Sequence, residues 1–321
     1  MIDRSHSLLS DPGIIGRAII ATGGKGGVGK TTTASALALH FAEVEGQETL
    51  IISSDPTPSL SDIFEQDLGL GRTKIRGVAR LHGHELKREV ILEAWKNRFG
   101  DEIYEVISSY LPVDREIIDY VAEAPGLADE QYILAYILDL HKTGGYDKII
   151  WDTAPAGATL GLLKLESRFY DHLNDAASLY VSMRSHLERM GERLGLKKRR
   201  SALDIINSWK ELADEIIKTI RDKEKVEFVI VTIPEGLGVS QTQRVIGELE
   251  EYGISVRHVV VNHVIPEEAA SDSSFLQSRM RVQRSYMDLL SKNYDGMLTV
   301  LPLLPGEVKG LDALRTIQKY L

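Results

Sequence analysis

Apolar residues along the chain gather in short runs that are separated by longer segments with helical patterns. Six such runs end at or near Thr22, Ser54, Asp152, Pro234, His263 and Pro305. The runs are rich in β-branched residues and do not alternate with polar ones, as is typical of strands buried on both faces. Because helical patterns lie between them, we expect an α/β fold with a mostly parallel sheet.

Two regions depart from this rhythm and are mainly helical in pattern. In the second, an apolar stripe runs from Leu173 to Leu194 at spacings of three and four, and a less regular stripe runs from Leu203 to Ile220. This spacing favours helices that pack in a core, and it is also compatible with a groove for an apolar partner. We therefore expect a sheet-containing core of residues 1–70, 124–163 and 226–321, and an inserted helical subdomain of residues 71–123 and 164–225.

Composition excludes several classes of protein. The 321 residues are 43% apolar and 26% charged, as in a globular protein, and the net charge of −9 argues against nucleic acid as a partner. The absence of cysteine excludes disulfides, thiolate zinc sites and iron–sulfur clusters. The N-terminus lacks the pattern of a signal peptide and no apolar run is long enough to span a membrane, so we expect a cytoplasmic protein.

The stretch GGKGGVGKTTT, Gly23 to Thr33, matches two phosphate-binding patterns at once. The spacing of its glycines fits a dinucleotide fingerprint, and Asp55 stands near the position of a ribose-binding acid. Lys30 and Thr31 favour the P-loop instead, since a dinucleotide site has no use for a lysine and a hydroxyl there. In a P-loop, backbone N–H groups surround the phosphates, Lys30 reaches the β- and γ-phosphates and Thr31 binds Mg²⁺.

Two carboxylates follow predicted strands and fit the same chemistry. Asp152 ends KIIWD, where a Walker B acid would hold the Mg²⁺ shell, although an aspartate there can also cap the next helix. Asp55 ends IISSD and could orient or deprotonate the attacking water, although a turn residue before Pro56 is the structural alternative. His82 and His84 alternate on one strand face without an evident third ligand, so we interpret them as structural.

These motifs together resemble the deviant-Walker-A ATPases, whose KGGVGKT contains a second lysine. SSDPTPSLSDIF resembles switch I of the ArsA branch, DTAPAGATL resembles its switch II, and VVVNH resembles its adenine-contacting strand. That branch contains arsenical-pump ATPases and the tail-anchored-protein targeting ATPases of the guided-entry pathway. The resemblance covers nearly the whole sheet-containing core, which it implies is a P-loop NTPase, whereas the helical regions match only in position.

The resemblance assigns roles to individual residues. It implies that the phosphates of ATP are bound by Gly26, Gly27, Val28, Gly29, Lys30, Thr31 and Thr32. It also implies that Thr31 and Asp152 organise Mg²⁺, that Asp55 activates water and that Asn262 contacts adenine. Lys25 resembles the signature lysine that reaches the phosphates of a partner subunit, which implies a homodimer and the role of an arginine finger.

The sequence departs from this family at three points. Pro58 stands where targeting members usually carry histidine, and SDSSFLQSRMRV replaces a segment that in many relatives contains a Cys-x-x-Cys pair, so no zinc is expected. Arsenical pumps sense metalloid through cysteines and usually carry two ATPase halves, whereas this chain has one P-loop.

We therefore expect a homodimeric, Mg²⁺-dependent ATPase that binds a hydrophobic client helix, such as the transmembrane segment of a tail-anchored protein. Release of the client would be coupled to ATP hydrolysis, and a membrane receptor is a possible further partner. The alternatives are the ATPase subunit of an arsenite or antimonite efflux pump and a positioning ATPase of the MinD or ParA type.

Overall fold

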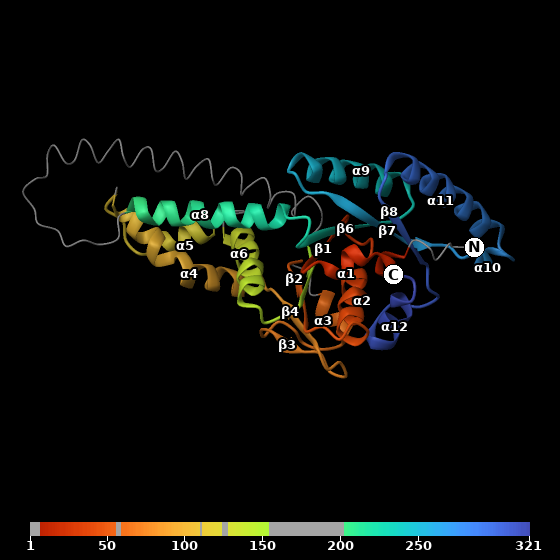
Figure 1. Cartoon of the computed structure of the whole chain (residues 1–321), viewed down its shortest axis with the longest axis horizontal. Coiled ribbons are helices and arrows are strands. Elements are labelled where there is room, and N and C mark those ends of the chain that lie inside the picture. Colours follow the sequence, from red (N-terminus) through yellow and green to blue (C-terminus); the bar gives the residue numbers. More distant parts are fainter. Residues whose placement is uncertain (1–6, 56–58, 110, 124–127, 154–201) are drawn as a thin grey trace, which may run out of the picture. The chain divides into compact units, whose positions relative to one another are not determined.

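The computed structural model describes residues 7–55, 59–109, 111–123, 128–153 and 202–321 (Figure 1). The strands are β1 (Ile19–Gly24), β2 (Thr49–Ser53), β3 (Thr73–Lys74), β4 (Leu81–Glu85), β5 (Lys148–Asp152), β6 (Val226–Thr232), β7 (Val256–Val264) and β8 (Met297–Pro302). The helices are η2 (Leu8–Ser10), α1 (Pro12–Gly16), α2 (Lys30–Glu43), α3 (Ser59–Phe64), α4 (Arg88–Ser108), α5 (Ile117–Ala122), α6 (Ala128–Thr143), α8 (Ala202–Arg221), α9 (Gly236–Glu251), α10 (Glu267–Ala270), α11 (Ser274–Asn293) and α12 (Gly310–Gln318).

The described residues fall into two compact units. The first unit holds the residues up to 87, those from 139 to 153 and those from 220 onward, and the second holds those from 88 to 138 and from 202 to 219. The first unit therefore contains the whole sheet, and the second is built from helices.

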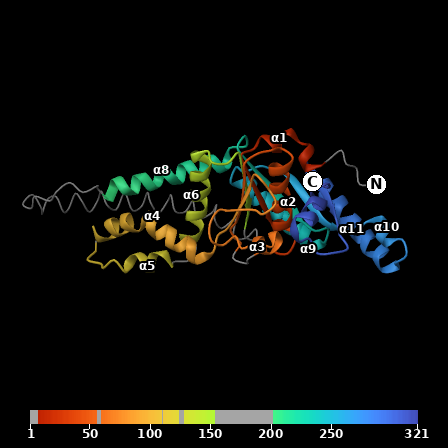
Figure 2. The ribbon, with the colours of Figure 1, turned by 90° about the horizontal axis from the view of Figure 1, so that it is seen from below.

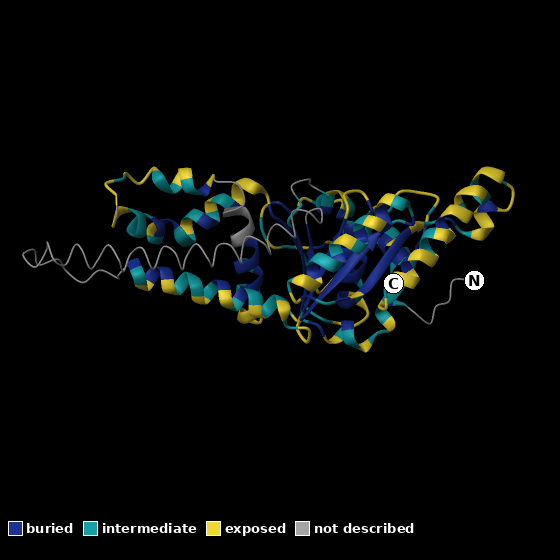
Figure 3. Cartoon of the chain, turned by 90° about the horizontal axis from the view of Figure 1, so that it is seen from above, coloured by how far each residue is buried: buried dark blue, intermediate teal, exposed yellow. Residues whose placement is uncertain are grey.

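The sheet of the first unit has eight strands in the order β3-β4-β2-β5-β1-β6-β7-β8. Each neighbouring pair is parallel except β3 and β4, so the α/β fold with a mostly parallel sheet is confirmed. All six predicted strands are present, and their central residues are buried, as Figure 3 shows for the sheet. Parallel order brings the carboxyl ends of β1, β2 and β5 to one edge of the sheet, which is where ligands bind in such folds.

The main apolar core lies between the sheet and α2. Ala and Leu side chains of α2 pack against alternate strand residues such as Ile20, Ile51 and Ile150, and α12 closes the same cluster through Leu314 and Ile317. Helix α9 contacts β6 and β7 and helix α11 contacts β7, and Figure 1 shows both helices on the side of the sheet away from α2 and α12. This packing fixes α2, and with it the loop that precedes α2, against the strand ends.

The second unit has a smaller core. Trp95 and Ile103 of α4 are buried with Ala122 of α5, and Figures 1 and 2 show these two helices side by side. Trp209 of α8 contacts the same cluster and donates a hydrogen bond from Nε1 to Oε2 of Glu102 at 2.7 Å. Trp209 thus connects α8 to α4 within this unit.

The stripe predicted from Leu203 to Ile220 lies on α8. Ile206, Ala213 and Ile216 of that stripe are buried, as a core-facing helix requires. The stripe from Leu173 to Leu194, Pro58 and the predicted switch II from residue 154 onward lie outside the described residues.

The expected boundaries of the helical subdomain differ from those of the two units. Residues 71–87 lie in the first unit, where β3 and β4 extend the sheet, and residues 128–138 lie in the second. Leu81–Glu85 reads LHGHE, with no β-branched residue, so it lacks the composition of the other buried strands. A Cβ on Gly83 would come within 2.8 Å of Leu68 Cδ1, so a larger residue there would require the Leu68 side chain to move.

In the part of the chain that the structure describes, no helix is long and apolar enough to cross a bilayer.

Candidate functional site

The glycine loop joins the end of β1 to the start of α2. Gly24 has φ +142° and a Cβ there would lie 2.2 Å from the carbonyl oxygen of Val231, so a side chain is excluded. Gly29 has φ +98° and forms the N-cap of α2 in the left-handed region, which favours glycine. The loop therefore has the strand–loop–helix context that the P-loop hypothesis requires.

The lysine and threonine that favour a P-loop are the first residues of α2. Lys30 is 5% exposed, and its Nζ turns back over the loop to donate to the carbonyl oxygen of Lys25 at 3.4 Å. Thr32 and Thr31 are partly buried, whereas Lys25, Gly26 and Gly27 are exposed. A cation over the loop and a helix N-terminus below it together favour an anionic ligand.

Asp152 and Thr31 meet at this edge of the sheet, although they are far apart in sequence. Thr31 Oγ1 donates to Asp152 Oδ2 at 2.8 Å, and Ser53 Oγ donates to the same oxygen at 3.1 Å. Thr22 Oγ1 lies 3.4 Å from Asp152 Oδ1. The carboxylate is completely buried, and three hydroxyl groups from three strands or helices face it.

Burial raises the pKa of Asp152 to about 6, against the hydrogen bond from Thr31 and the charge of Lys30, which act in the opposite direction. The protein therefore does not fully compensate the charge of this carboxylate. Carboxylate and hydroxyl oxygens are the ligands that Mg²⁺ prefers, so Asp152 and Thr31 fit a divalent cation.

Asp55 directly follows β2, beside the same group. Its backbone N–H lies 3.4 Å from Ser53 Oγ, and its negative charge contributes to raising the pKa of Asp152. Two carboxylates thus share one end of the sheet, one buried and one half-buried. This arrangement suits a site where one carboxylate holds a cation and the other faces a reactant.

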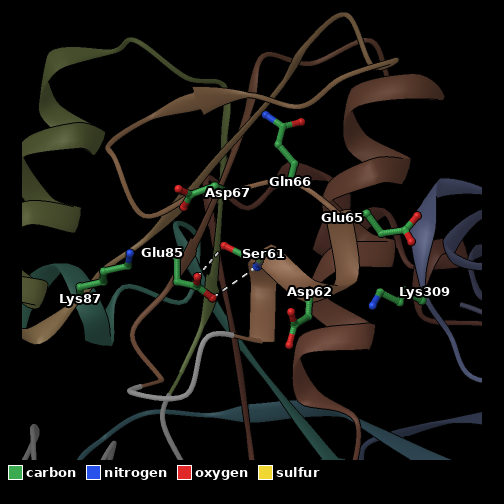
Figure 4. Close-up of a pocket in the computed structure, with 8 residues that line it drawn as sticks. All are labelled: Ser61, Asp62, Glu65, Gln66, Asp67, Glu85, Lys87 and Lys309. Atoms are coloured by element: carbon green, nitrogen blue, oxygen red, sulfur yellow. Dashed lines mark hydrogen bonds between the residues drawn. The ribbon is translucent and has the colours of Figure 1, made fainter.

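Helix α3 begins against Thr31 and is held there by Glu85. Ser59 Oγ lies 3.2 Å from Thr31 Oγ1. The buried carboxylate of Glu85 accepts from Leu60 N at 2.9 Å. It also accepts from Ser61 Oγ at 2.6 Å, as Figure 4 shows. These bonds satisfy backbone groups at the start of the helix, so Glu85 fixes where α3 stands relative to the glycine loop.

Asn262 lies at the end of β7 and contacts the glycine loop from the other side. Its Nδ2 donates to the carbonyl oxygen of Val28 at 2.9 Å, and a Cβ on Gly29 would come within 2.2 Å of the same nitrogen. Its Oδ1 accepts from the backbone N–H of His263 at 2.8 Å. The structure therefore brings Asn262 to the glycine loop, and its predicted contact with adenine stays a prediction.

The structure thus places Lys30, Thr31, Asp55, Asp152 and Asn262 around one loop. Sequence reasoning missed Thr22, Ser53, Ser59 and Glu85, because small polar residues at strand ends carry no distinct pattern. Ser53 stands beside Asp55 in the predicted switch, which was the available signal. Lys25 is exposed in the single chain that the structure describes. Its role at the phosphates of a partner subunit therefore stays a prediction.

His82 and His84 lie on β4, the strand that also carries Glu85. Among the residues that the structure describes, no three His, Cys, Asp or Glu side chains are arranged to hold a metal ion. The His82 ring instead packs edge-on against Tyr146, with centroids 5.6 Å apart. This packing agrees with a structural role for His82, and the structural role of His84 stays an interpretation.

Comparison with known proteins gives a single family. Residues 17–321 match the family model described as anion-transporting ATPase, ArsA type. The chain is 32% identical over 300 residues to the ATPase GET3A of Arabidopsis thaliana, and the aligned residues cover 92% of this chain and 81% of that protein. It is 30% identical over 314 residues to the ATPase GET3 of Komagataella phaffii, covering 94% and 89%.

A third relative carries a different name. The putative arsenical pump-driving ATPase 2 of Aquifex aeolicus is 29% identical over 306 residues, which is 93% of this chain and 97% of that protein. The family match spans the glycine loop, Asp55, Asp152 and Asn262 together. The chain therefore belongs to the ArsA family of anion-transporting ATPases, and its enzymatic activity is the hydrolysis of ATP.

Proposed function

We propose that the ATPase is Mg²⁺-dependent and that Thr31 and Asp152 hold the cation. The observation that carries this proposal is the 2.8 Å hydrogen bond between Thr31 Oγ1 and the buried, incompletely compensated Asp152 carboxylate. When bound, the cation would neutralise phosphate charge and orient the terminal phosphate. Gly26 to Thr32 supply the backbone donors, the lysine and the hydroxyl that bind the phosphates.

Asp55 is proposed to orient the attacking water and accept its proton. Its position beside Asp152, at the carboxyl end of β2, supports this role. The Asp55→Asn variant should bind ATP with wild-type affinity and lose at least about a hundredfold in turnover, the size of a general-base effect. Unchanged turnover of the purified variant would assign water activation to another residue.

Lys25 is proposed to contact the phosphates of a partner subunit in a homodimer. The exposed position of this lysine in a single chain is compatible with such a contact. Turnover per chain should then rise with protein concentration, and inactive Lys25→Ala should be rescued by mixing with Asp55→Asn. In the mixed dimer, one site has an intact Asp55 and receives Lys25 from the other subunit. Failure of rescue, with both variants dimeric, would contradict the role in trans.

The second unit is proposed to bind the hydrophobic helix of a tail-anchored client in the cytoplasm, with release coupled to hydrolysis. Support comes from the family motifs, from the relatives named GET3, and from a helical unit inserted between elements of the ATPase core. The test is capture of a freshly translated tail-anchored helix by the purified protein. A charge-substituted helix serves as the control, and absence of capture in every nucleotide state would contradict the proposal.

One observation favours a second function. The Aquifex aeolicus relative is named as a putative arsenical pump-driving ATPase. Metalloid-sensing members of the family use cysteines, and this chain has none. Turnover that rises with arsenite, while capture of the client helix fails, would favour this second function over the first.

A further inference from the structure

Strand β7 ends in an irregular turn directly beside the glycine loop. Its pairing with β8 shifts register between Val261 and Val264, and His263 between them has φ +58°. A left-handed conformation is uncommon for a residue that is not glycine, and it costs free energy unless its surroundings hold it. Bulges of this kind re-aim neighbouring side chains and concentrate next to functional sites.

The side chain that this turn re-aims is Asn262. Its Oδ1 accepts from His263 N at 2.8 Å and its Nδ2 donates to Val28 O at 2.9 Å, so the amide has one orientation and cannot flip. An asparagine amide has two donors and two acceptor lone pairs, which leaves one of each for a ligand. That pair matches adenine, which presents an acceptor at N7 and a donor at N6, whereas guanine presents two acceptors there.

Gln283 of α11 holds the turn from behind. It is 6% exposed, its Nε2 donates to His263 O at 2.9 Å, and its Oε1 accepts from Ile265 N at 2.9 Å. One side chain thus satisfies backbone groups on both sides of Val264. Without Gln283 the two groups would be buried and unpaired, and His263 could relax from its left-handed conformation.

We propose that Gln283 is a positioning residue that sets the base selectivity of the nucleotide site. It acts through the backbone of His263, whose N–H fixes the orientation of the Asn262 amide. The inference rests on the proposed contact between Asn262 and adenine, and it extends the site to a helix that the P-loop motifs do not include.

The test compares the affinities for ATP, GTP and inorganic triphosphate in full-length variants, by competition with a fluorescent adenine nucleotide. Gln283→Met keeps the size of the side chain and removes both hydrogen bonds. It should lower the ratio of ATP to GTP affinity by about tenfold, the loss expected for one misplaced hydrogen-bonding pair, and leave triphosphate affinity unchanged.

Two further variants calibrate this result. Gln283→Glu keeps the acceptor for Ile265 N and loses the donor to His263 O, so it should give an intermediate ratio even if the Met variant folds poorly. Gln277→Met is the matched control, because Gln277 lies on the same helix and its exposed side chain donates to Ser271 O. Its ratio of ATP to GTP affinity should be that of the wild type.

An unchanged ratio in both Gln283 variants would overturn the inference. So would an equal loss of affinity for ATP, GTP and triphosphate, since that is the signature of a merely structural role. Asn262→Ala distinguishes the role of Gln283 from the adenine contact of Asn262. If it removes selectivity while the Gln283 variants do not, only the inference about Gln283 fails. If Asn262→Ala also leaves the ratio unchanged, the proposed adenine contact fails as well.

Discussion

Two buried groups of charged residues lie at opposite ends of the parallel sheet, and they are balanced differently. At the carboxyl ends, the pKa of Asp152 is raised to about 6 because burial outweighs its hydrogen bonds and the nearby lysine. At the amino ends of β6 and β7, His258 lies between two carboxylates, with Nδ1 3.0 Å from Glu227 Oε1 and Nε2 3.0 Å from Asp11 Oδ2.

The second group is satisfied within the protein. Each ring nitrogen of His258 has a carboxylate oxygen as its partner, and the backbone N–H of Gly13 holds the pKa of Asp11 below its usual value. This difference in charge compensation between the two ends of the sheet indicates which end is functional. At the carboxyl ends, next to the glycine loop, the protein leaves the charge of one carboxylate partly uncompensated. At the amino ends, the charged groups bind one another and hold η2 and α1 against the sheet.

The largest expected effect comes from removing the uncompensated charge. Asp152→Asn keeps the shape and can still accept from Thr31, but it loses the carboxylate that would hold Mg²⁺. Turnover should fall by at least about a thousandfold, while the free energy of unfolding of the nucleotide-free protein at pH 7 should rise by about 1–3 kcal/mol. Steady-state kinetics and urea denaturation measure the two effects, and a variant that loses stability would contradict the comparison.

The opposite end should respond in the opposite way. His258→Leu leaves Glu227 and Asp11 without their shared partner, so the free energy of unfolding should fall by about 2–3 kcal/mol. Turnover per folded chain should stay at the wild-type level, because this group lies at the opposite end of the sheet from Thr31 and Asp152. A large loss of turnover in the folded variant would show that the two ends are coupled.

The stability of the protein should depend on pH through His84 and Asp152, with opposite signs. Burial lowers the pKa of His84 to about 4, with a smaller contribution from the charge of Arg72. The unfolded chain then binds more protons between pH 4 and 6.5, so stability is lost as pH falls through that range, by at most about 3 kcal/mol. Asp152 has the opposite sign, since its raised pKa makes the folded state bind more protons between pH 3.8 and about 6.

Unfolding of His84→Leu at pH 4.5 and 7 should therefore show a smaller acid loss of stability than the wild type. The same measurement on Asp152→Asn should show a larger loss. His82→Leu, on the same strand, is the matched control. Equal acid sensitivity of the wild type and both variants would mean that neither group titrates across this range.

The smallest expected effect concerns a third buried carboxylate. Glu85 lies at the ligand-binding end, yet its oxygens accept three hydrogen bonds from Leu60 and Ser61, so it should behave as a positioning group. Glu85→Leu should lower turnover by about tenfold with little change in ATP affinity, and Glu85→Gln should restore most of it. Asp62→Asn is the control, because Asp62 is exposed on α3, the helix that carries Leu60 and Ser61. A tenfold loss of turnover in that variant would show that Glu85 has no special role.

The sequence predicts the parts of this site that depend on local pattern. The glycine loop needs its strand before it and its helix after it, and both neighbours are strongly patterned, so Lys30 and Thr31 could be placed. Asp152 ends a run of buried apolar residues, which fixes it at the strand end. The order of strands then brings Asp55 to the same edge without further information.

The contacts that complete the site depend on distant residues and carry no such pattern. Ser53 and Thr22 face Asp152 only because β2 and β1 flank β5 in the sheet. Gln283 stands among other polar residues on a helix whose surface is largely exposed, and only the tertiary structure shows that it reaches His263. The sequence analysis expected β4 in the helical subdomain because LHGHE lacks β-branched residues, whereas β4 belongs to the sheet of the first unit.

The shortness of β3 has a consequence for assembly. A sheet edge with a long free strand invites backbone pairing with a second chain. Here that edge ends in the two residues Thr73 and Lys74, turned antiparallel to the rest, and the opposite edge strand ends at Pro302, which has no N–H to donate. The β3 edge therefore offers no long template, so two copies that met there would associate through side chains and loops rather than through backbone pairing.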